Sequence, residues 1–214
     1  PDRILGRIST AKNELIGPTQ FHPRDYFDEI VKRAYERYQE QLVANNAVDF
    51  DDLLMYVALL FASEPAVLER YRNTYDHILV DEFQDTNGAQ YALVKQLVEK
   101  HRRIFCVGDE DQSIYRWRGA DYRNLSRLRS DFPDLHTVLL EQNYRSTQTI
   151  LDAARSVIGK NPHRTPKQLF SEREGGPKII LYEAHNEQYE ALFVVDTIAQ
   201  LVAAWEVEPG EVAV

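Results

Sequence analysis

Two short apolar runs that end in acidic residues constrain the fold of this chain more than any other feature. The run "HILVDE" ends in Asp81 and Glu82, and the run "RIFCVGD" ends in Asp109. A segment rich in Ala, Leu and Val at about 89–100, with the character of a helix, separates the two runs. Uninterrupted apolar strands that alternate with helices are typical of a parallel sheet covered on both faces. We therefore predict an α/β fold built on a parallel sheet.

The acidic ends of both runs are expected at one edge of that sheet, where ligands of parallel α/β sheets bind. Asp81 suits Mg²⁺, a hard cation that prefers carboxylate and phosphate oxygens. Glu82 is placed to share this metal site or to orient and deprotonate a water molecule. A solvated strand end without a function is the alternative interpretation of the same two residues.

The first block of the chain, residues 1–74, has the pattern of amphipathic helices. Apolar residues from Phe27 to Leu42 recur at the spacing of one helix face. Asp49 is placed to cap a second helix at "VDFDDLL", and the acidic residues that follow it suit the first turn of a helix. We interpret this acidic triplet as a helix start rather than as a metal site.

The rest of the chain has an α/β pattern in two further blocks. The block 75–137 holds the two acid-ended strands, and a helix around 122–129 follows them. The block 138–214 begins with the strand "HTVLLEQN" and contains a second strand, "KIILYEA". We expect helices at about 147–158 and 187–204, with a nascent strand at the last residues.

A polar loop follows the second acid-ended strand and carries Gln112 in the stretch "VGDEDQSIY". A Gln amide at the edge of a phosphate site donates hydrogen bonds to a terminal phosphate or holds the attacking water. The sequence therefore predicts a phosphate-sensing role for Gln112. An ordinary loop hydrogen bond is the alternative.

Aromatic and basic residues alternate immediately afterwards. Tyr115 and Trp117 alternate with Arg116 and Arg118, and the segment 113–130 holds five Arg against one acid in a chain whose net charge is −9. Aromatic faces stack on unpaired bases with ~1–3 kcal/mol per base, and Arg neutralises the phosphate backbone. This pattern favours a nucleic-acid contact. A core Trp and a solvated Arg-bearing helix face are the alternative.

The stretch "LEQNYRS" places Tyr144 and Arg145 at a predicted strand-to-helix junction. An Arg in such a position can reach a phosphate held by a neighbouring domain. Arginine fingers of this kind contribute ~10³–10⁵ in rate. A structural Arg that caps the following helix is the alternative.

Three of these stretches, taken in their order and spacing, carry a family resemblance. "VDEFQDTN", "VGDEDQSIYRWRGA" and "LEQNYRS" resemble motifs II, III and IV of the UvrD/Rep/PcrA group of superfamily 1 DNA helicases, and "VDFDDLL" matches that group as well. The resemblance extends over nearly the whole chain. It implies that 75–137 and 138–214 are portions of two RecA-like motor domains and that 1–74 is part of a helical accessory domain.

The resemblance also implies an ATP site and its cofactors, ATP and Mg²⁺. By that likeness, Asp81 coordinates Mg²⁺ and Glu82 is the catalytic base of ATP hydrolysis. Gln112 is similar to the residue that senses the γ-phosphate. Tyr144 is similar to the residue that stacks on adenine, and Arg145 to the finger supplied by the second motor domain.

DNA is the partner that the resemblance implies, as single strands and as junctions of single and double strands. Trp117, with Tyr115 and Arg118 nearby, resembles the platform on which a single-stranded base stacks. The implied activity is 3′-to-5′ translocation and unwinding, in repair or replication. A motor subunit of a helicase–nuclease complex and a DNA- or partner-binding piece without turnover are the alternatives.

One departure from the family pattern concerns the phosphate cradle. The sequence holds no G-x-x-x-x-G-K-[ST] pattern, and its one Gly-Lys pair, Gly159-Lys160, lacks the upstream Gly. With Pro1 as its first residue, the chain is expected to be an internal piece whose missing flanking motor sequence is its partner in hydrolysis. No apolar stretch approaches the ~20 residues of a membrane span, and the lone Cys106 suits a reducing compartment. The resemblance to DNA helicases implies a cytoplasmic, nucleoid-associated protein.

Overall fold

A computed structural model describes residues 1–161, 164–173 and 175–214, with the side chain of Arg118 outside the described part. The chain forms two compact units, which we describe separately. Unit 1 comprises residues 1–139 and 161–166, and unit 2 comprises 140–160 and 167–214.

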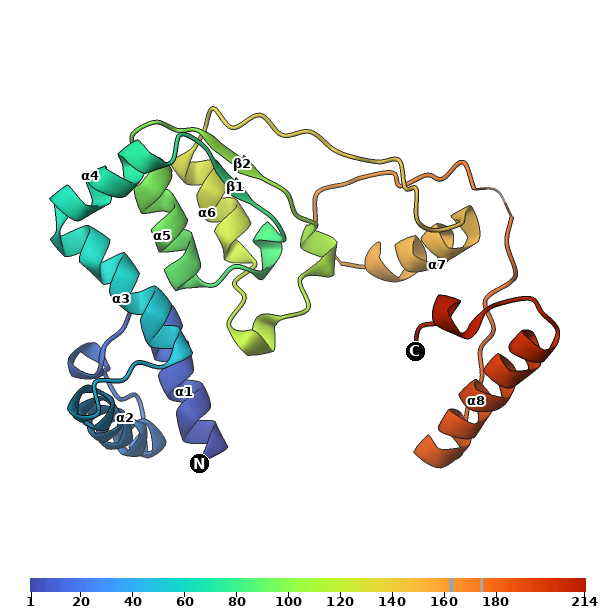
Figure 1. The fold of residues 1–214 in the computed structure, drawn as a ribbon, viewed down its shortest axis with the longest axis horizontal. Helices are drawn as coiled ribbons and strands as arrows, with labels where there is room; N and C mark the ends of the chain where they lie inside the picture. Colours follow the sequence, from blue (N-terminus) through green and yellow to red (C-terminus); the bar gives the residue numbers. More distant parts are fainter. Residues whose placement is uncertain (162–163, 174) are drawn as a thin grey trace. The chain divides into compact units, whose positions relative to one another are not determined.

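Among the described residues, four α-helices precede the first strand, one helix separates the two strands, and three helices follow the second strand (Figure 1). Those of unit 1 are α1 (Asp2–Asn13), α2 (Tyr26–Ala44), α3 (Phe50–Ser63), α4 (Pro65–Thr74), β1 (Ile78–Val80), α5 (Gly88–Val98), β2 (Ile104–Cys106) and α6 (Arg123–Asp131). Those of unit 2 are α7 (Gln148–Ile158) and α8 (Glu187–Ala203). Short 3₁₀ turns include η2 (Phe83–Asp85), η3 (Glu110–Gln112), η4 (Arg116–Arg118) and η5 (Pro209–Glu211).

The predicted helices of the first block are confirmed. α2 begins after Asp25, whose carboxylate accepts a hydrogen bond from the Asp28 backbone N–H at 2.8 Å. Its apolar face buries Val31 and Tyr35 completely. α3 begins after Asp49, as predicted, and Asp49 and Asp52 cap each other's backbone N–H groups.

A buried lysine that the sequence pattern did not single out ties this helical segment together. Lys12 is 0% exposed, and its Nζ lies 2.7 Å from Asp49 Oδ2 and 2.8 Å from Asp52 Oδ1. Burial alone would raise the pKa of Asp49, but the hydrogen bonds from Lys12 and from the Asp52 backbone lower it below its ordinary value. The acidic triplet therefore starts a helix and also fastens α1 to α3.

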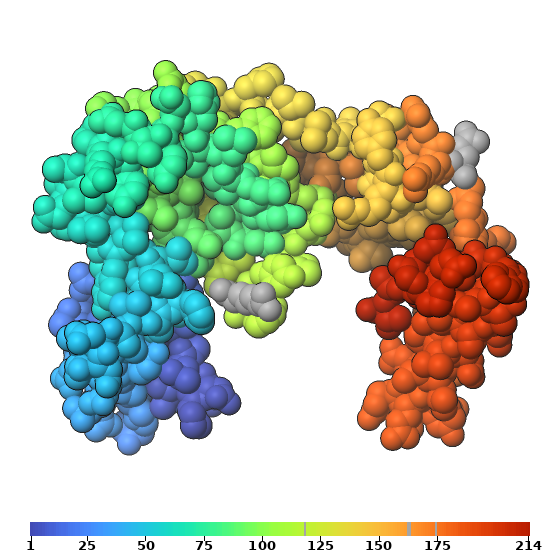
Figure 2. Space-filling model, in the orientation of Figure 1, coloured from blue at the N-terminus to red at the C-terminus, as the bar shows by residue number. Residues whose placement is uncertain are grey.

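β1 and β2 form a parallel pair, with Val80 opposite Cys106. The pairing continues past the strand ends, because Val107 N–H donates to Val80 O at 2.8 Å and Phe83 N–H donates to Val107 O at 3.0 Å. α5 connects the two strands, and α3 packs against it. Figure 2 shows the segment of α3, in cyan, directly beside the teal-green segment of α4 that follows it along the chain.

The sheet is covered on one face among the described residues, so the prediction of cover on both faces is wrong here. Successive strand residues point to opposite faces. Ile78 and Val80 pack into the cluster formed with α5 and α6, whereas Leu79 is 72% exposed and Phe105 is 62% exposed. Both helices that follow the strands pack on the same face, and this leaves the other face open.

The predicted helix around 122–129 is confirmed as α6, and Leu128 and Phe132 are buried in the same cluster. Cys106 lies on the covered face and is half-buried. Burial raises the pKa of its thiol to about 11, so the thiol stays protonated at neutral pH, as expected for an inert cysteine.

Unit 2 has helices where the pattern predicts them, but its predicted strands are absent from the described residues. The segments 136–143 and 178–184 have no strand pairing beyond one bridge between Gln142 and Phe170, and the last residues, 212–214, follow η5 without regular structure. Leu181 is 95% exposed. A strand is stable only when a neighbour satisfies its backbone groups, and these apolar runs have no such neighbour in the described part.

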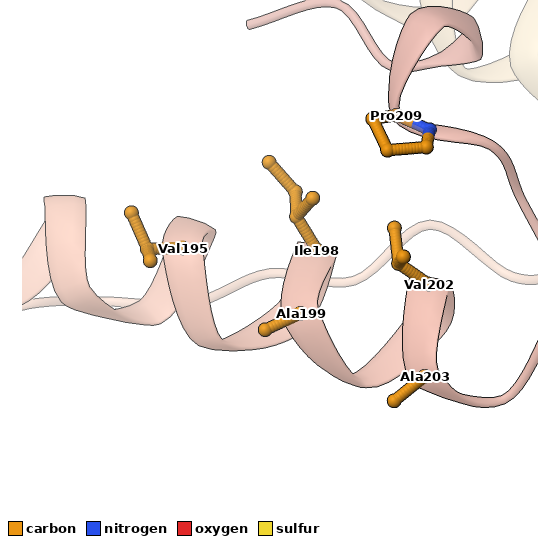
Figure 3. Close-up of a pocket in the computed structure, with 6 residues that line it drawn as sticks. All are labelled: Val195, Ile198, Ala199, Val202, Ala203 and Pro209. Atoms are coloured by element: carbon orange, nitrogen blue, oxygen red, sulfur yellow. The ribbon is translucent and has the colours of Figure 1, made fainter.

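An apolar face of α8 is likewise open. Figure 3 shows a pocket between this helix and the 3₁₀ turn that follows it, lined by Val195, Ile198, Ala199, Val202, Ala203 and Pro209. Among the described residues, no helix combines the length and the apolar character that crossing a membrane requires.

Candidate functional site

The carboxyl end of β1 turns sharply at its two acidic residues. Asp81 is exposed, and its Oδ1 accepts a hydrogen bond from the Glu82 backbone N–H at 2.9 Å. Glu82 adopts a left-handed conformation, with φ 49° and ψ 43°, which costs a residue with a side chain about 1–3 kcal/mol. The next residue, Phe83, is buried in the cluster below the sheet. Its burial anchors the turn and keeps both carboxylates at the surface.

A buried amide joins the two strand ends. Gln84 is 7% exposed, and its Nε2 donates to Glu82 Oε2 at 2.7 Å. Its Oε1 accepts from the Asp109 backbone N–H, at the end of β2, at 2.9 Å. Sequence reasoning assigned no role to Gln84. No local pattern marks this residue, because its partner Asp109 lies 25 positions away in the sequence.

Gln112 reaches the same rim from the turn that follows β2. Its Nε2 donates to Asp109 Oδ2 at 2.8 Å, and Asp109 also caps the turn by accepting from the Asp111 backbone N–H at 3.0 Å. The structure therefore brings Glu82 and Gln112 together through Gln84 and Asp109. The loop hydrogen bond that was the alternative for Gln112 is one link of this chain of contacts.

An ion pair that the sequence did not indicate holds the Gln112 turn in place. Arg164, which belongs to unit 1, donates from Nε to Asp111 Oδ1 at 3.1 Å and from Nη2 to Asp111 Oδ2 at 2.6 Å. Both side chains are largely buried. Paired hydrogen bonds of this type fix orientation as well as distance.

The aromatic residues that follow are exposed, as a base-stacking surface requires. Trp117 is 74% exposed, and Tyr115 lies beside it with 6.4 Å between the ring centroids and 53° between the ring planes. The core-Trp alternative is therefore excluded. Gly119 ends this turn with φ +93°, and a Cβ there would lie 3.0 Å from Asn13 Nδ2. The side chain of Arg118 lies outside the described part of the chain.

Part of the positive charge of this region is matched internally. Asp121 accepts from Arg123 Nε at 2.8 Å and pairs with Arg127 Nη1 at 3.2 Å. Burial alone would raise the pKa of Asp121, but the hydrogen bonds from Arg123 hold it below its usual value. Arg123 and Arg127 are thus directed toward Asp121, which favours the turn with Trp117 over α6 as the contact surface.

Tyr144 and Arg145 lie in an exposed turn of unit 2. Asn143 Oδ1 holds this turn by accepting from the backbone N–H groups of Arg145 and Ser146 at 2.9 and 2.7 Å. The Tyr144 hydroxyl donates a hydrogen bond to Gln142 Oε1 at 2.9 Å. Within the described residues the Arg145 guanidinium makes no hydrogen bond or ion pair. The alternative that Arg145 caps the following helix is therefore not supported.

The donor set at the rim fits a magnesium ion that is shared with a phosphate ligand. Asp81 keeps one oxygen beyond its backbone hydrogen bond, and Glu82 lies next to it. The described residues hold no cluster of three or more metal-ligating side chains. Mg²⁺ commonly binds through one or two carboxylates and completes its shell with water and phosphate oxygens, so two carboxylates are sufficient.

Comparisons with known proteins cover the whole chain. The model of the UvrD/REP helicase N-terminal domain matches residues 2–133, and that of the UvrD-like helicase C-terminal domain matches residues 138–214. The ATP-dependent DNA helicase PcrA of Bacillus subtilis is 47% identical over 100% of this chain and 29% of its own length. The protein of the same name from Staphylococcus aureus (strain Mu50) is 50% identical over 92% of this chain and 27% of its own length.

The chain thus spans less than a third of these relatives. The two family models adjoin near residue 135 and together account for nearly every residue. The chain belongs to the UvrD/REP helicase family.

Proposed function

We propose that the full-length protein is an ATP-dependent DNA helicase that moves 3′-to-5′ along single-stranded DNA and unwinds duplexes at junctions. The observation that carries this proposal is the shared rim, where the Glu82 carboxylate and the Gln112 amide are joined through Gln84 and Asp109. A carboxylate pair for a metal and a base, next to an amide that can sense a phosphate, is what phosphoryl transfer to water needs. Relatives named ATP-dependent DNA helicase support it.

In this proposal each residue at the nucleotide has one role. Asp81 would hold Mg²⁺, which would neutralise charge on the phosphates when ATP is bound. Glu82 accepts a proton from the attacking water. Gln112 donates to the γ-phosphate. From unit 2, Tyr144 stacks on adenine, and the unpaired guanidinium of Arg145 stabilises the charge that develops on the transferred group.

The DNA contact follows from the exposed aromatic turn. Trp117 and Tyr115 present ring faces to single-stranded bases. Arg118 belongs to the same sequence stretch, and its proposed role is to neutralise the DNA backbone. Gln112 and Trp117 belong to one short stretch of chain between β2 and α6. Loss of the γ-phosphate at Gln112 therefore shifts Trp117, and this couples hydrolysis to stepping.

The domain assignment is part of the same proposal. Residues 1–74 belong to a helical accessory domain, 75–137 to the C-terminal part of a first RecA-like motor domain, and 138–214 to the start of a second one. The parallel pair of β1 and β2 with its connecting helix supports the motor-domain assignment. Repair or replication in the cytoplasm, at the nucleoid, is the setting that fits these activities.

The test is the Glu82→Gln variant of the full-length protein. Turnover of ATP in the presence of single-stranded DNA should fall by about 10²–10⁴-fold, because the general base is lost, while nucleotide binding is retained. Glu99→Gln, a change of the same kind at an exposed carboxylate beyond α5, is the matched control and should keep its turnover. Equal turnover in Glu82→Gln and wild type would contradict the proposal.

A further inference from the structure

The buried amide of Gln84 stands between the base and the phosphate sensor of the proposed reaction. We propose that Gln84 is a positioning residue that holds the Glu82 carboxylate and the Gln112 turn in one fixed geometry. This inference rests on the proposed ATP hydrolysis and adds to it a residue that touches neither nucleotide nor metal. Its role is to set where the base points and to tie that direction to the sensor.

Three hydrogen bonds define the orientation of the amide, and the longest of them runs from Nε2 to Asp85 Oδ2 at 3.4 Å. Nε2 donates to the Glu82 carboxylate at 2.7 Å, and Oε1 accepts from the Asp109 backbone N–H at 2.9 Å. A carboxylate only accepts and a backbone N–H only donates. Rotating the amide by half a turn would set oxygen against oxygen at one end and N–H against N–H at the other. Both partners therefore require the observed orientation.

The packing around Gln84 leaves the amide little freedom. A Cβ at Gly108 would lie 2.7 Å from Gln84 Oε1 and 3.2 Å from the Phe83 backbone nitrogen. Glycine is thus needed at 108 for β2 to pass this close. The Gln84 side chain is buried, whereas Glu82 is exposed. An exposed Glu samples several rotamers, and one bond from a fixed, buried donor selects among them.

The contacts continue from Gln84 to the sensor. Asp109 donates its backbone N–H to Gln84 and accepts the Gln112 Nε2–H at Oδ2, 2.8 Å away. A displacement of Gln112 on loss of a phosphate therefore acts on the residue that holds Gln84, and through it on Glu82. The base and the sensor are linked by two side chains and one backbone group.

Two substitutions in the full-length protein test this role. Gln84→Glu keeps the shape but sets a carboxylate against Glu82 in place of a donor. Gln84→Met keeps the volume but removes all three hydrogen bonds of the amide. For each, kcat of the DNA-stimulated ATPase should fall by about 10- to 100-fold, as expected for a misplaced catalytic group. KM for ATP should stay within about twofold, because ground-state binding is untouched.

Two controls separate positioning from a general structural role. Gln96→Glu makes the same chemical change at a part-buried amide on α5, where Nε2 donates to the Ala58 carbonyl at 3.0 Å, and should leave kcat and KM unchanged. The double variant Gln84→Met with Gln112→Ala should lose less than the product of the two single losses, because both act through one network. Should Gln84→Met fail to fold, Gln84→Glu decides the result.

The outcomes distinguish this inference from the proposed function. Wild-type kcat in both Gln84 variants, with an active wild type, would overturn the inference alone. An equal loss of kcat in Gln96→Glu, or fully multiplicative losses in the double variant, would overturn it as well. Absence of DNA-stimulated turnover in the wild type would overturn both the inference and the proposed function.

Discussion

Unit 1 and unit 2 place their functional side chains by different means. In unit 1 a buried side chain, Gln84, connects the rim residues, and two apolar clusters lie beneath the helices and strands. In unit 2, Leu151 is the one apolar side chain that is buried among the described residues. Tyr144 and Arg145 there depend on a backbone turn held by Asn143. The difference shows that Glu82 and Gln112 are tied together by a buried side chain, whereas Arg145 is held only by its local turn.

The largest expected effect concerns the arginine of unit 2. Arg145→Ala in the full-length protein should lower the DNA-stimulated kcat by about 10³-fold or more, as loss of an arginine finger does. Stability should be unchanged, because the guanidinium has no partner among the described residues. Arg155→Ala, which removes an exposed arginine 3.6 Å from Asp152, is the control. An Arg145→Ala protein that unfolds more easily but hydrolyses ATP at the normal rate would contradict this prediction, because Arg145 would then be a structural residue.

The next largest effect concerns the stability of unit 1. Lys12→Met removes the cation between Asp49 and Asp52 and leaves two uncompensated carboxylates. Breaking a buried pair in this way costs about 3–5 kcal/mol of unfolding free energy, measurable by urea denaturation. Lys100→Met, which breaks the exposed pair with Glu69, should cost at most about 1 kcal/mol. Equal costs for the two variants would show that unit 1 does not depend on its buried network.

The smallest of the three effects concerns DNA binding by the two tryptophans, Trp117 in unit 1 and Trp205 in unit 2. Trp117→Ala should weaken single-stranded DNA binding by about 1–3 kcal/mol, the contribution of one stacked base. It should leave stability unchanged, because the indole is exposed. Trp205 of unit 2 is also exposed, and Trp205→Ala should not alter binding in a fluorescence titration with labelled DNA. If Trp205→Ala had the larger effect, the DNA contact would belong to unit 2.

The sequence predicted the features that local patterns determine. The apolar runs before Asp81 and Asp109 form the expected parallel strands, because a helix of suitable length connects them and each satisfies the backbone of the other. The helix start at Asp49 follows from the side-chain chemistry of an N-cap. The exposure of Trp117 agrees with its position among arginines.

The features that the sequence did not predict depend on contacts between distant residues. Lys12 meets Asp52 across 40 positions of chain, and Arg164 meets Asp111 across 53. No periodicity reports such pairs. The strand expected at 178–184 shows the opposite failure, because its apolar pattern is present but the described residues supply no pairing partner. An apolar pattern is therefore a reliable sign of a strand only where a second strand is present to pair with it.

The central claim is that Gln112 senses the nucleotide and passes its state to the DNA contact. The most direct measurement is the ATPase rate of the full-length Gln112→Ala variant with and without single-stranded DNA, together with its rate of translocation. We predict that stimulation by DNA and translocation are both lost, while DNA binding through Trp117 is retained. If Gln112→Ala matched the wild type in both DNA-stimulated ATPase and translocation, the claim would be contradicted.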